Sequence, residues 1–183
     1  RKEPLVLLDG AHNPAGSRVV GNFLAETKQV RKGRLLLIIG ILADKNITGI
    51  LKELVPYCDE MILTRPDYSG AASLDTLRQG LRGSIVQVTP KERISEAVAY
   101  AMGRLLPQDI LCITGSLYTV GAAKAFLNLL VSSIIFSPCS LITSGVIQAD
   151  KGYNKTKTTT TILMAMALAA WNKIRRWCKE CGW

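Results

Sequence analysis

The polar side chains best suited to chemistry lie in three short segments of the 183-residue sequence, each next to an apolar run. Asp9 and His12 stand in LLDGAHNPAG, Lys45 in GILADKN, and Ser116 in ITGSLYTVG. A carboxylate such as that of Asp9 can accept hydrogen bonds from the vicinal hydroxyls of a ribose, and a lysine ammonium can pair with a phosphate or a carboxylate. His12 and Ser116 each precede a predicted helix, whose first amides favour an anion. These residue types therefore suit a site for a nucleotide or an acidic substrate.

Each of these residues also has a plain structural explanation. Asp9 can close a turn before Gly10, Lys45 can form an ordinary surface ion pair, and Ser116 can cap a helix. A lone histidine such as His12 can simply face solvent in a turn. Since distant His12 is the only base partner for Ser116, hydrolase chemistry with a serine nucleophile is not expected.

The cysteines form an odd set of five and do not indicate a metal centre. Cys178 and Cys181 make a single Cys-Lys-Glu-Cys pair, whereas a structural zinc site needs four ligands. Cys58 and Cys112 fall in apolar surroundings that suit buried, reduced thiols. A cytoplasmic protein is therefore expected, without a metal site in this chain.

Up to about Leu130, short apolar runs alternate with longer helical patterns, which predicts βαβ units. The predicted strands are Leu5–Leu8, Leu35–Ile39, Met61–Thr64, Ile85–Val88 and Ile110–Thr114. The predicted helices run from Asn13-Pro14 to about Thr27, over Ile47–Val55, from Ser73 through Leu81, over Glu92–Leu106, and from about Tyr118 to Leu130.

The runs LLLII and ILCIT are continuously apolar, as expected of parallel strands that are buried on both faces. The fold class is therefore predicted to be α/β, with a Rossmann-like, mostly parallel sheet and helices on both faces. In such sheets ligands bind beyond the carboxyl ends of the strands. Three loops are accordingly predicted to lie together as the site, namely residues 9–16, 42–46 and 115–118.

Residues 1–130 are predicted to form this domain, and residues 131–183 an extension of unknown role, poorly structured or with a terminal helix. The extension contains the tract KTKTTTT and carries 7 Lys and Arg against 2 Asp and Glu, so it holds over half of the net charge of +9. The remaining charge is that of an ordinary solvated surface, and nucleic-acid binding is not expected. No apolar run reaches the length of a membrane span, so membrane insertion is not expected either.

Four segments occur in a fixed order over about residues 4–128: LLDGAHNPAG, GILADKN, ILTRPDYSGAAS and ITGSLYTVGAAKAFL. Together they resemble the C-terminal domain of the folylpolyglutamate synthase/dihydrofolate synthase family, within the Mur ligase superfamily. The run Gly-Ala-His-Asn-Pro resembles the folate branch rather than the cell-wall ligases. One departure is Asn46, which stands where the family usually has a second Asp.

The resemblance implies an ATP-dependent ligase that adds L-glutamate to folate or dihydropteroate through an acyl phosphate. It implies that Asp9 binds the ribose of ATP, with Asn13 as a further nucleotide contact. His12, Lys45 and Ser116 are implied to lie at the reacting end, near the phosphate or the incoming glutamate.

The glycine-rich loop that cradles a triphosphate does not occur in this sequence, and neither does GxGxxG. In the family, that loop and the magnesium ligands belong to a preceding ATPase domain, so the chain is expected to be inactive alone and to act beside that domain as a monomer. Two other classes stay open. One is a stand-alone Rossmann-like module that binds a nucleotide or another ligand, and the other is a noncatalytic interaction domain anchored by the basic tail.

Overall fold

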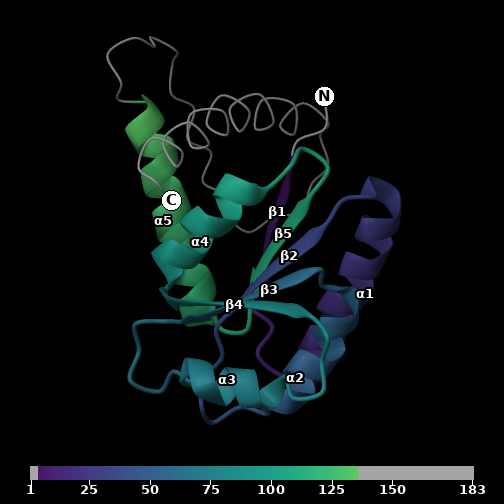
Figure 1. Ribbon diagram of the computed structural model, residues 1–183. Coiled ribbons are helices and arrows are strands. Elements are labelled where there is room, and N and C mark those ends of the chain that lie inside the picture. The colour runs from purple at the N-terminus through teal and green to yellow at the C-terminus, as the bar shows by residue number, and fades with distance from the viewer. Residues whose placement is uncertain (1–3, 136–183) are drawn as a thin grey trace, which may run out of the picture.

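The computed structural model describes residues 4–135, which form a parallel five-stranded sheet between two layers of helices (Figure 1). The strands are β1 (Leu5–Leu8), β2 (Leu35–Ile39), β3 (Glu60–Arg65), β4 (Gln87–Arg93) and β5 (Ile110–Thr114). The helices are α1 (Pro14–Arg31), α2 (Ile47–Leu54), the 3-10 turn η1 (Val55–Tyr57), α3 (Leu74–Gly80), α4 (Ile94–Arg104) and α5 (Leu117–Ile135). The strand order is β1-β5-β2-β3-β4, and every neighbouring pair is parallel. The predicted α/β class is therefore confirmed.

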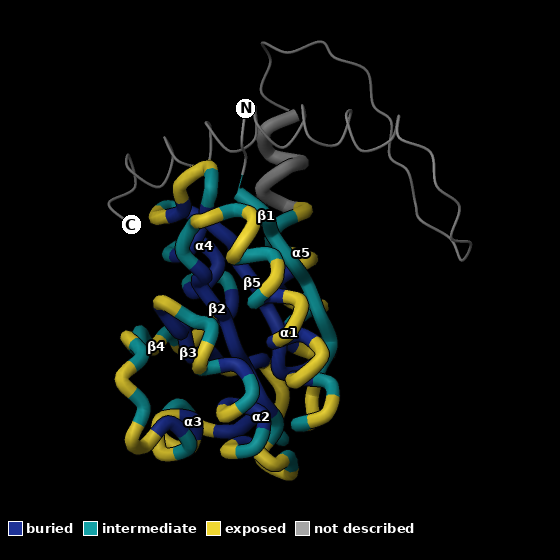
Figure 2. Tube along the Cα trace, turned by 90° about the vertical axis from the view of Figure 1, so that its right-hand side faces the viewer, coloured by how far each residue is buried: buried dark blue, intermediate teal, exposed yellow. Residues whose placement is uncertain are grey.

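The interior strands β2 and β5 are buried along their whole length, as their apolar runs predicted. Because side chains alternate across a strand, Leu37 and Ile39 of β2 join a core under α1, α2 and α3, whereas Leu36 and Ile38 join a second core under α4 and α5. All residues of β2 and β5 are buried, and Figure 2 shows this dark centre of the molecule. The buried sheet thus fixes the positions of the loops that follow its strands.

Four helices begin at a side chain that accepts a backbone N–H from three residues further on. The capping pairs are Asn13 with Gly16, Asn46 with Gly49, Ser73 with Thr76 and Ser116 with Thr119. Asn46 thus has a structural role as a helix cap, although the sequence analysis noted it only as a departure from the family pattern. Helix α1 runs four residues beyond its predicted end and stops where Lys32 adopts the left-handed conformation, with φ of 55°.

The fourth strand and the helix after it each begin two residues later in the chain than predicted. The strand was expected at Ile85–Val88 and forms at Gln87–Arg93, while Ile85 is fully exposed and α4 begins only at Ile94. β4 is an edge strand that pairs with β3 alone, so Pro90 can lie within it, since a missing N–H costs nothing on the open side. The predicted bounds Ile85–Val88 were therefore wrong, since the strand begins two residues later and continues through Pro90 to Arg93.

Helix α5 continues to Ile135, past the predicted end at Leu130. The predicted extension falls mostly outside the described residues, so its boundary and role stay predictions. Within residues 4–135, no helix combines the length and the apolar character that crossing a bilayer would require.

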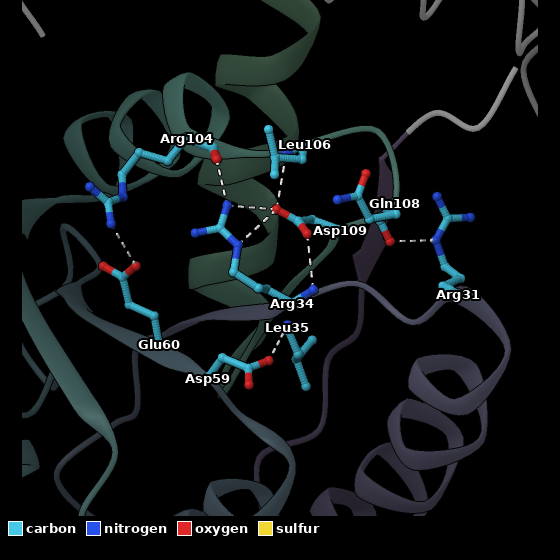
Figure 3. Close-up of polar contacts among 9 residues, drawn as sticks. All are labelled: Arg31, Arg34, Leu35, Asp59, Glu60, Arg104, Leu106, Gln108 and Asp109. Atoms are coloured by element: carbon cyan, nitrogen blue, oxygen red, sulfur yellow. Dashed lines mark hydrogen bonds and ion pairs between the residues drawn. The ribbon is translucent and has the colours of Figure 1, made fainter.

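Buried acidic side chains hold the sheet together at the amino ends of its strands (Figure 3). The side chain of Asp109, 1% exposed, accepts the backbone N–H of Arg34 at 2.9 Å, that of Leu106 at 2.9 Å and the Arg34 Nη2 at 2.7 Å. Glu60 accepts the Tyr100 hydroxyl at 2.8 Å, with Arg104 Nη2 3.4 Å away. These contacts lie at the amino ends of the strands, whereas the predicted site lies at their carboxyl ends.

The hydrogen bonds of Asp109 determine its charge state. Burial by itself would raise the pKa of this carboxyl, but the guanidinium of Arg34 and the amides of Leu106 and Arg34 lower the pKa below its ordinary value. Because the folded pKa lies below the unfolded one, the charged form stabilises the fold above the unfolded pKa, near 3.9. This stabilisation is lost as the pH falls through the folded pKa.

We expect Asp109→Asn to lower the free energy of unfolding by about 2–3 kcal/mol at pH 7, because an amide replaces a buried, charge-assisted acceptor of four N–H donors. Urea unfolding of both proteins measures the difference, which should shrink as the pH is lowered towards 3. Glu53→Gln is the control, since Glu53 pairs with Arg18 on the surface and should change stability little. An equal loss of unfolding free energy in both variants would contradict the stabilising role assigned to the buried Asp109 carboxylate.

Candidate functional site

The loops at the carboxyl ends of β1, β2 and β5 lie together, as the sequence predicted. The amide of Gly115, after β5, donates to the carbonyl of Ala11, after β1, at 3.1 Å. The hydroxyl of Thr119 donates to the carbonyl of Gly40, after β2, at 2.9 Å. The loop after β2 in turn pairs with the loop after β3, since Ala43 N donates to Gly70 O at 2.9 Å. Four strand ends therefore form one continuous surface.

Asp9 and His12 shape the loop after β1. One carboxylate oxygen of half-buried Asp9 accepts the amide of Ala11 at 2.8 Å, which makes the turn that the structural explanation anticipated. The Nδ1 of exposed His12 lies 2.9 Å from the carbonyl of Gly10. Because a carbonyl can only accept, Nδ1 must be the donor in this hydrogen bond, and Nε2 is left for an outside partner.

Lys45 and Asn13 are also occupied by local contacts. The Lys45 ammonium lies 2.8 Å from the carboxylate of Asp44, and this exposed pair lowers the pKa of Asp44 through its hydrogen bond. Asn13 uses its carbonyl oxygen to cap α1 through Gly16, at 2.8 Å. The Lys45 loop and the Asn13 loop lie close to each other, since a Cβ on Gly49 would lie 2.8 Å from the ring of Pro14.

Ser116 is buried, only 2% exposed, and its hydroxyl is fully engaged at the start of α5. It accepts the amide of Thr119 at 3.1 Å, and the two hydroxyl oxygens lie 2.9 Å apart. Since Thr119 gives its own proton to Gly40, Ser116 must donate to Thr119. The chain Ser116–Thr119–Gly40 therefore fixes the helix start, and leaves the first backbone amides of α5 for an outside acceptor.

Gly115 and a pair of tyrosines also shape this surface. Gly115 and Tyr118 fall within the predicted loop 115–118, but the sequence assigned no role to either of them or to Tyr68. Gly115 has φ of +103°, and a Cβ there would lie 2.7 Å from the carbonyl of Gly40, so no larger residue fits. Tyr68 and Tyr118 stack with ring centroids 4.2 Å apart and 12° between their planes. The sequence could have indicated these tyrosines only by their positions, since Tyr68 follows β3 and Tyr118 follows Ser116.

The thiols do not contribute chemistry to this surface. Cys112 is buried in β5, and Cys58 donates to the carbonyl of Leu54 at 3.2 Å. Burial raises the pKa of Cys58 to about 12 and also raises the pKa of Cys112. Both are protonated at neutral pH, as expected of structural thiols. Within residues 4–135, no group of three or more His, Cys, Asp or Glu is arranged to hold a metal ion.

A parallel sheet whose loops gather polar groups at the carboxyl ends defines a ligand-binding α/β domain, and comparison with known proteins narrows the class. The family model described as "Mur ligase, glutamate ligase domain" matches residues 1–117. The chain belongs to this family.

The curated relatives belong to the folate branch of this family, which the Gly-Ala-His-Asn-Pro run had suggested. The dihydrofolate synthase/folylpolyglutamate synthase of Haemophilus influenzae is 27% identical over 120 residues, 64% of this chain and 27% of the relative. The protein of the same name from Mycobacterium tuberculosis is 30% identical over 139 residues, 68% of this chain and 28% of the relative. The chain thus spans little more than a quarter of these relatives.

Solved structures show the same relationship. The bifunctional folylpolyglutamate synthase/dihydrofolate synthase of Yersinia pestis, complexed with AMPPNP and Mn ion, has a TM-score of 0.62 at 30% identity, over 70% of this chain and 30% of that chain. The folylpolyglutamate synthase of M. tuberculosis, complexed with ADP, has a TM-score of 0.57 at 28% identity, over 66% of this chain and 29% of that chain. The chain is similar to one domain of these enzymes.

We expect Gly115→Ala to destabilise the protein more than Gly83→Ala, measured by urea unfolding. Both glycines have positive φ, +103° and +82°, which costs an alanine about 1–2 kcal/mol. Only at Gly115 would the new methyl group also collide with backbone, which adds about 1–3 kcal/mol. Gly83 has no atom within 4 Å of the same position and is therefore the matched control. Equal losses would mean that the contact with Gly40 is not tight.

Proposed function

We propose that this chain is the glutamate-ligase domain of an enzyme that uses ATP to join L-glutamate to a folate or dihydropteroate acid. The observation that carries the proposal is the family match over residues 1–117, which ends at the helix start held by Ser116. The loops that carry Asp9, His12 and Ser116 adjoin one another across the neighbouring strands β1 and β5. The polar groups implied by the resemblance therefore share one surface.

Asp9 is proposed to bind the ribose of ATP. One of its carboxylate oxygens accepts the Ala11 amide, and a carboxylate has further acceptor positions for two vicinal hydroxyls. Its half-buried position makes such hydrogen bonds less exposed to competition from water. Asn13 is proposed as a second nucleotide contact through its side-chain NH₂, because its carbonyl oxygen already caps α1.

His12, Lys45 and the start of α5 are proposed to face the reacting end. Lys45 would exchange its exposed partner Asp44 for a phosphate or the glutamate carboxylate, at little cost because surface pairs are weak. His12 would contribute its Nε2, since its Nδ1 is engaged by the carbonyl of Gly10. Ser116 is proposed to line this end by fixing α5, so that the amides of Leu117 and Tyr118 meet a carboxylate.

The proposed reaction transfers the terminal phosphoryl group of ATP to the carboxylate of the acid. The amine of glutamate then attacks the acyl carbon, forms the amide and releases phosphate. Positioning and charge stabilisation dominate such a step. The triphosphate and magnesium are proposed to be held by a separate ATPase domain, over which this domain closes. The similarity to chains that bind AMPPNP and Mn ion, of which this chain covers 30%, supports this division.

We expect the 183-residue chain alone to show no ligation, because the phosphate-binding loop is not in its sequence. Fused in place of the C-terminal domain of the H. influenzae synthase, it should support ATP-dependent formation of glutamylated product. Product formation with radiolabelled glutamate measures both. Ligation by the chain alone would contradict the division between domains, and a folded but inactive fusion would contradict the proposed function.

In that fusion, Asp9→Asn should raise the Michaelis constant for ATP about tenfold or more, because a neutral amide replaces a charge-assisted acceptor worth about 1.5–3 kcal/mol. The turn should survive, since the amide oxygen can still accept the Ala11 N–H. Steady-state kinetics at saturating glutamate give the constant. Asp75→Asn, on exposed α3, is the control. An ATP dependence that matches the control would exclude the ribose assignment.

A further inference from the structure

A hollow of about 900 Å³ opens beside the candidate site, and none of the roles proposed above uses it. It lies at the carboxyl ends of β3 and β4, between the loop after β3, the start of α4 and one side of α5. Its charged lining includes Arg65, Asp67, Glu92 and Arg93. Its size suits a short chain of linked residues rather than a single ion.

Two arginines stand side by side at this hollow. β3 and β4 pair in regular register up to Thr64 and Lys91, after which Glu92 is bulged out and Arg65 pairs with Arg93. Such bulges re-aim side chains, often near active sites. Adjacent like charges repel each other. Among the ion pairs of residues 4–135, none includes either guanidinium, so the repulsion is not relieved by a salt bridge with Asp67 or Glu92.

The groups around the two arginines also favour carboxylates. A guanidinium presents a planar fork that matches a carboxylate in two-point contact. Arg93 is the N-cap of α4 and makes no side-chain cap, so the first amides of the helix receive no capping acceptor. The hydroxyl-bearing residues Ser69 and Ser95 line the same space.

Apolar surface completes the hollow and connects it to the site. Ile94 and Phe126 line it together with the ring of Tyr68, which is 40% exposed. Tyr68 stacks on Tyr118, two residues beyond Ser116. A ligand that extends past this ring pair therefore passes from the hollow to the start of α5.

We propose that this hollow binds the γ-linked glutamyl chain of the acid substrate, with α-carboxylates on Arg65 and Arg93. This inference rests on the proposed function. Such a chain carries one carboxylate per residue, methylene groups that pack against Tyr68 and Phe126, and amide N–H groups that Asp67 and Glu92 can accept. Two neighbouring arginines together with the acids Asp67 and Glu92 suit a ligand that carries both carboxylates and amide N–H groups better than phosphate, which has no N–H to donate to an acid.

The experiment titrates the 183-residue chain with tri-γ-L-glutamate by isothermal calorimetry, at low ionic strength, with L-glutamate and inorganic phosphate as comparison ligands. We expect saturable binding of the tripeptide, at least tenfold tighter than that of either comparison ligand. Arg65→Gln/Arg93→Gln should weaken tripeptide binding at least tenfold. Lys52→Gln, which removes one positive charge from an exposed position of α2, should not.

The paired variant Arg65→Lys/Arg93→Lys keeps both charges and should bind with intermediate affinity, since the forked contact is lost. If circular dichroism shows that the glutamine variant does not fold, the lysine variant tests the binding instead. No saturable tripeptide binding, phosphate binding of equal strength, or equal weakening by Lys52→Gln would each overturn the proposal. The titration needs neither ATP nor a partner domain, so its result is independent of whether the fusion ligates glutamate.

Discussion

The insertion of β5 between β1 and β2 is the constraint on which the rest of the structure depends. β5 is the last strand of residues 4–135, yet it forms parallel ladders with both the first and the second. The loop of Asp9 and the start of α5 therefore become neighbours, although about a hundred residues separate them in sequence. Gly115 and Gly40 meet at the end of these ladders, and the Thr119 hydroxyl joins α5 to β2.

The charged side chains at the amino ends of the strands differ in their surroundings from those at the carboxyl ends. At the amino ends, Asp109 and Glu60 are buried and surrounded by donors, so their charges stabilise the strand positions. At the carboxyl ends, the charged side chains of Lys45, Arg65 and Arg93 are exposed or half exposed, and the last two have no ion pair among the described residues. Groups that are not satisfied within the fold can bind a ligand without first breaking a strong internal contact.

The cap residues have an observed structural role in the same segments for which a binding role is proposed. Asn13 and Ser116 each satisfy helix amides, as the plain structural explanation proposed. In doing so they fix the helix starts at the site, where a positive helix end faces the space a phosphate or carboxylate would enter. For Ser116 the hydroxyl proton is already given to Thr119, so any binding at this point falls to the backbone amides.

The sequence by itself determined the class of fold, four of the five strands and the caps Asn13, Ser73 and Ser116, because buried parallel strands are continuously apolar and caps are local. It also showed the family, through motifs at four strand ends. It misplaced β4, because an edge strand is only half buried and tolerates Pro90. Only the tertiary structure decided the strand order, the engagement of Ser116 by Thr119 and Gly40, and the pairing of Arg65 with Arg93. These depend on contacts between residues far apart in sequence, which no local pattern specifies.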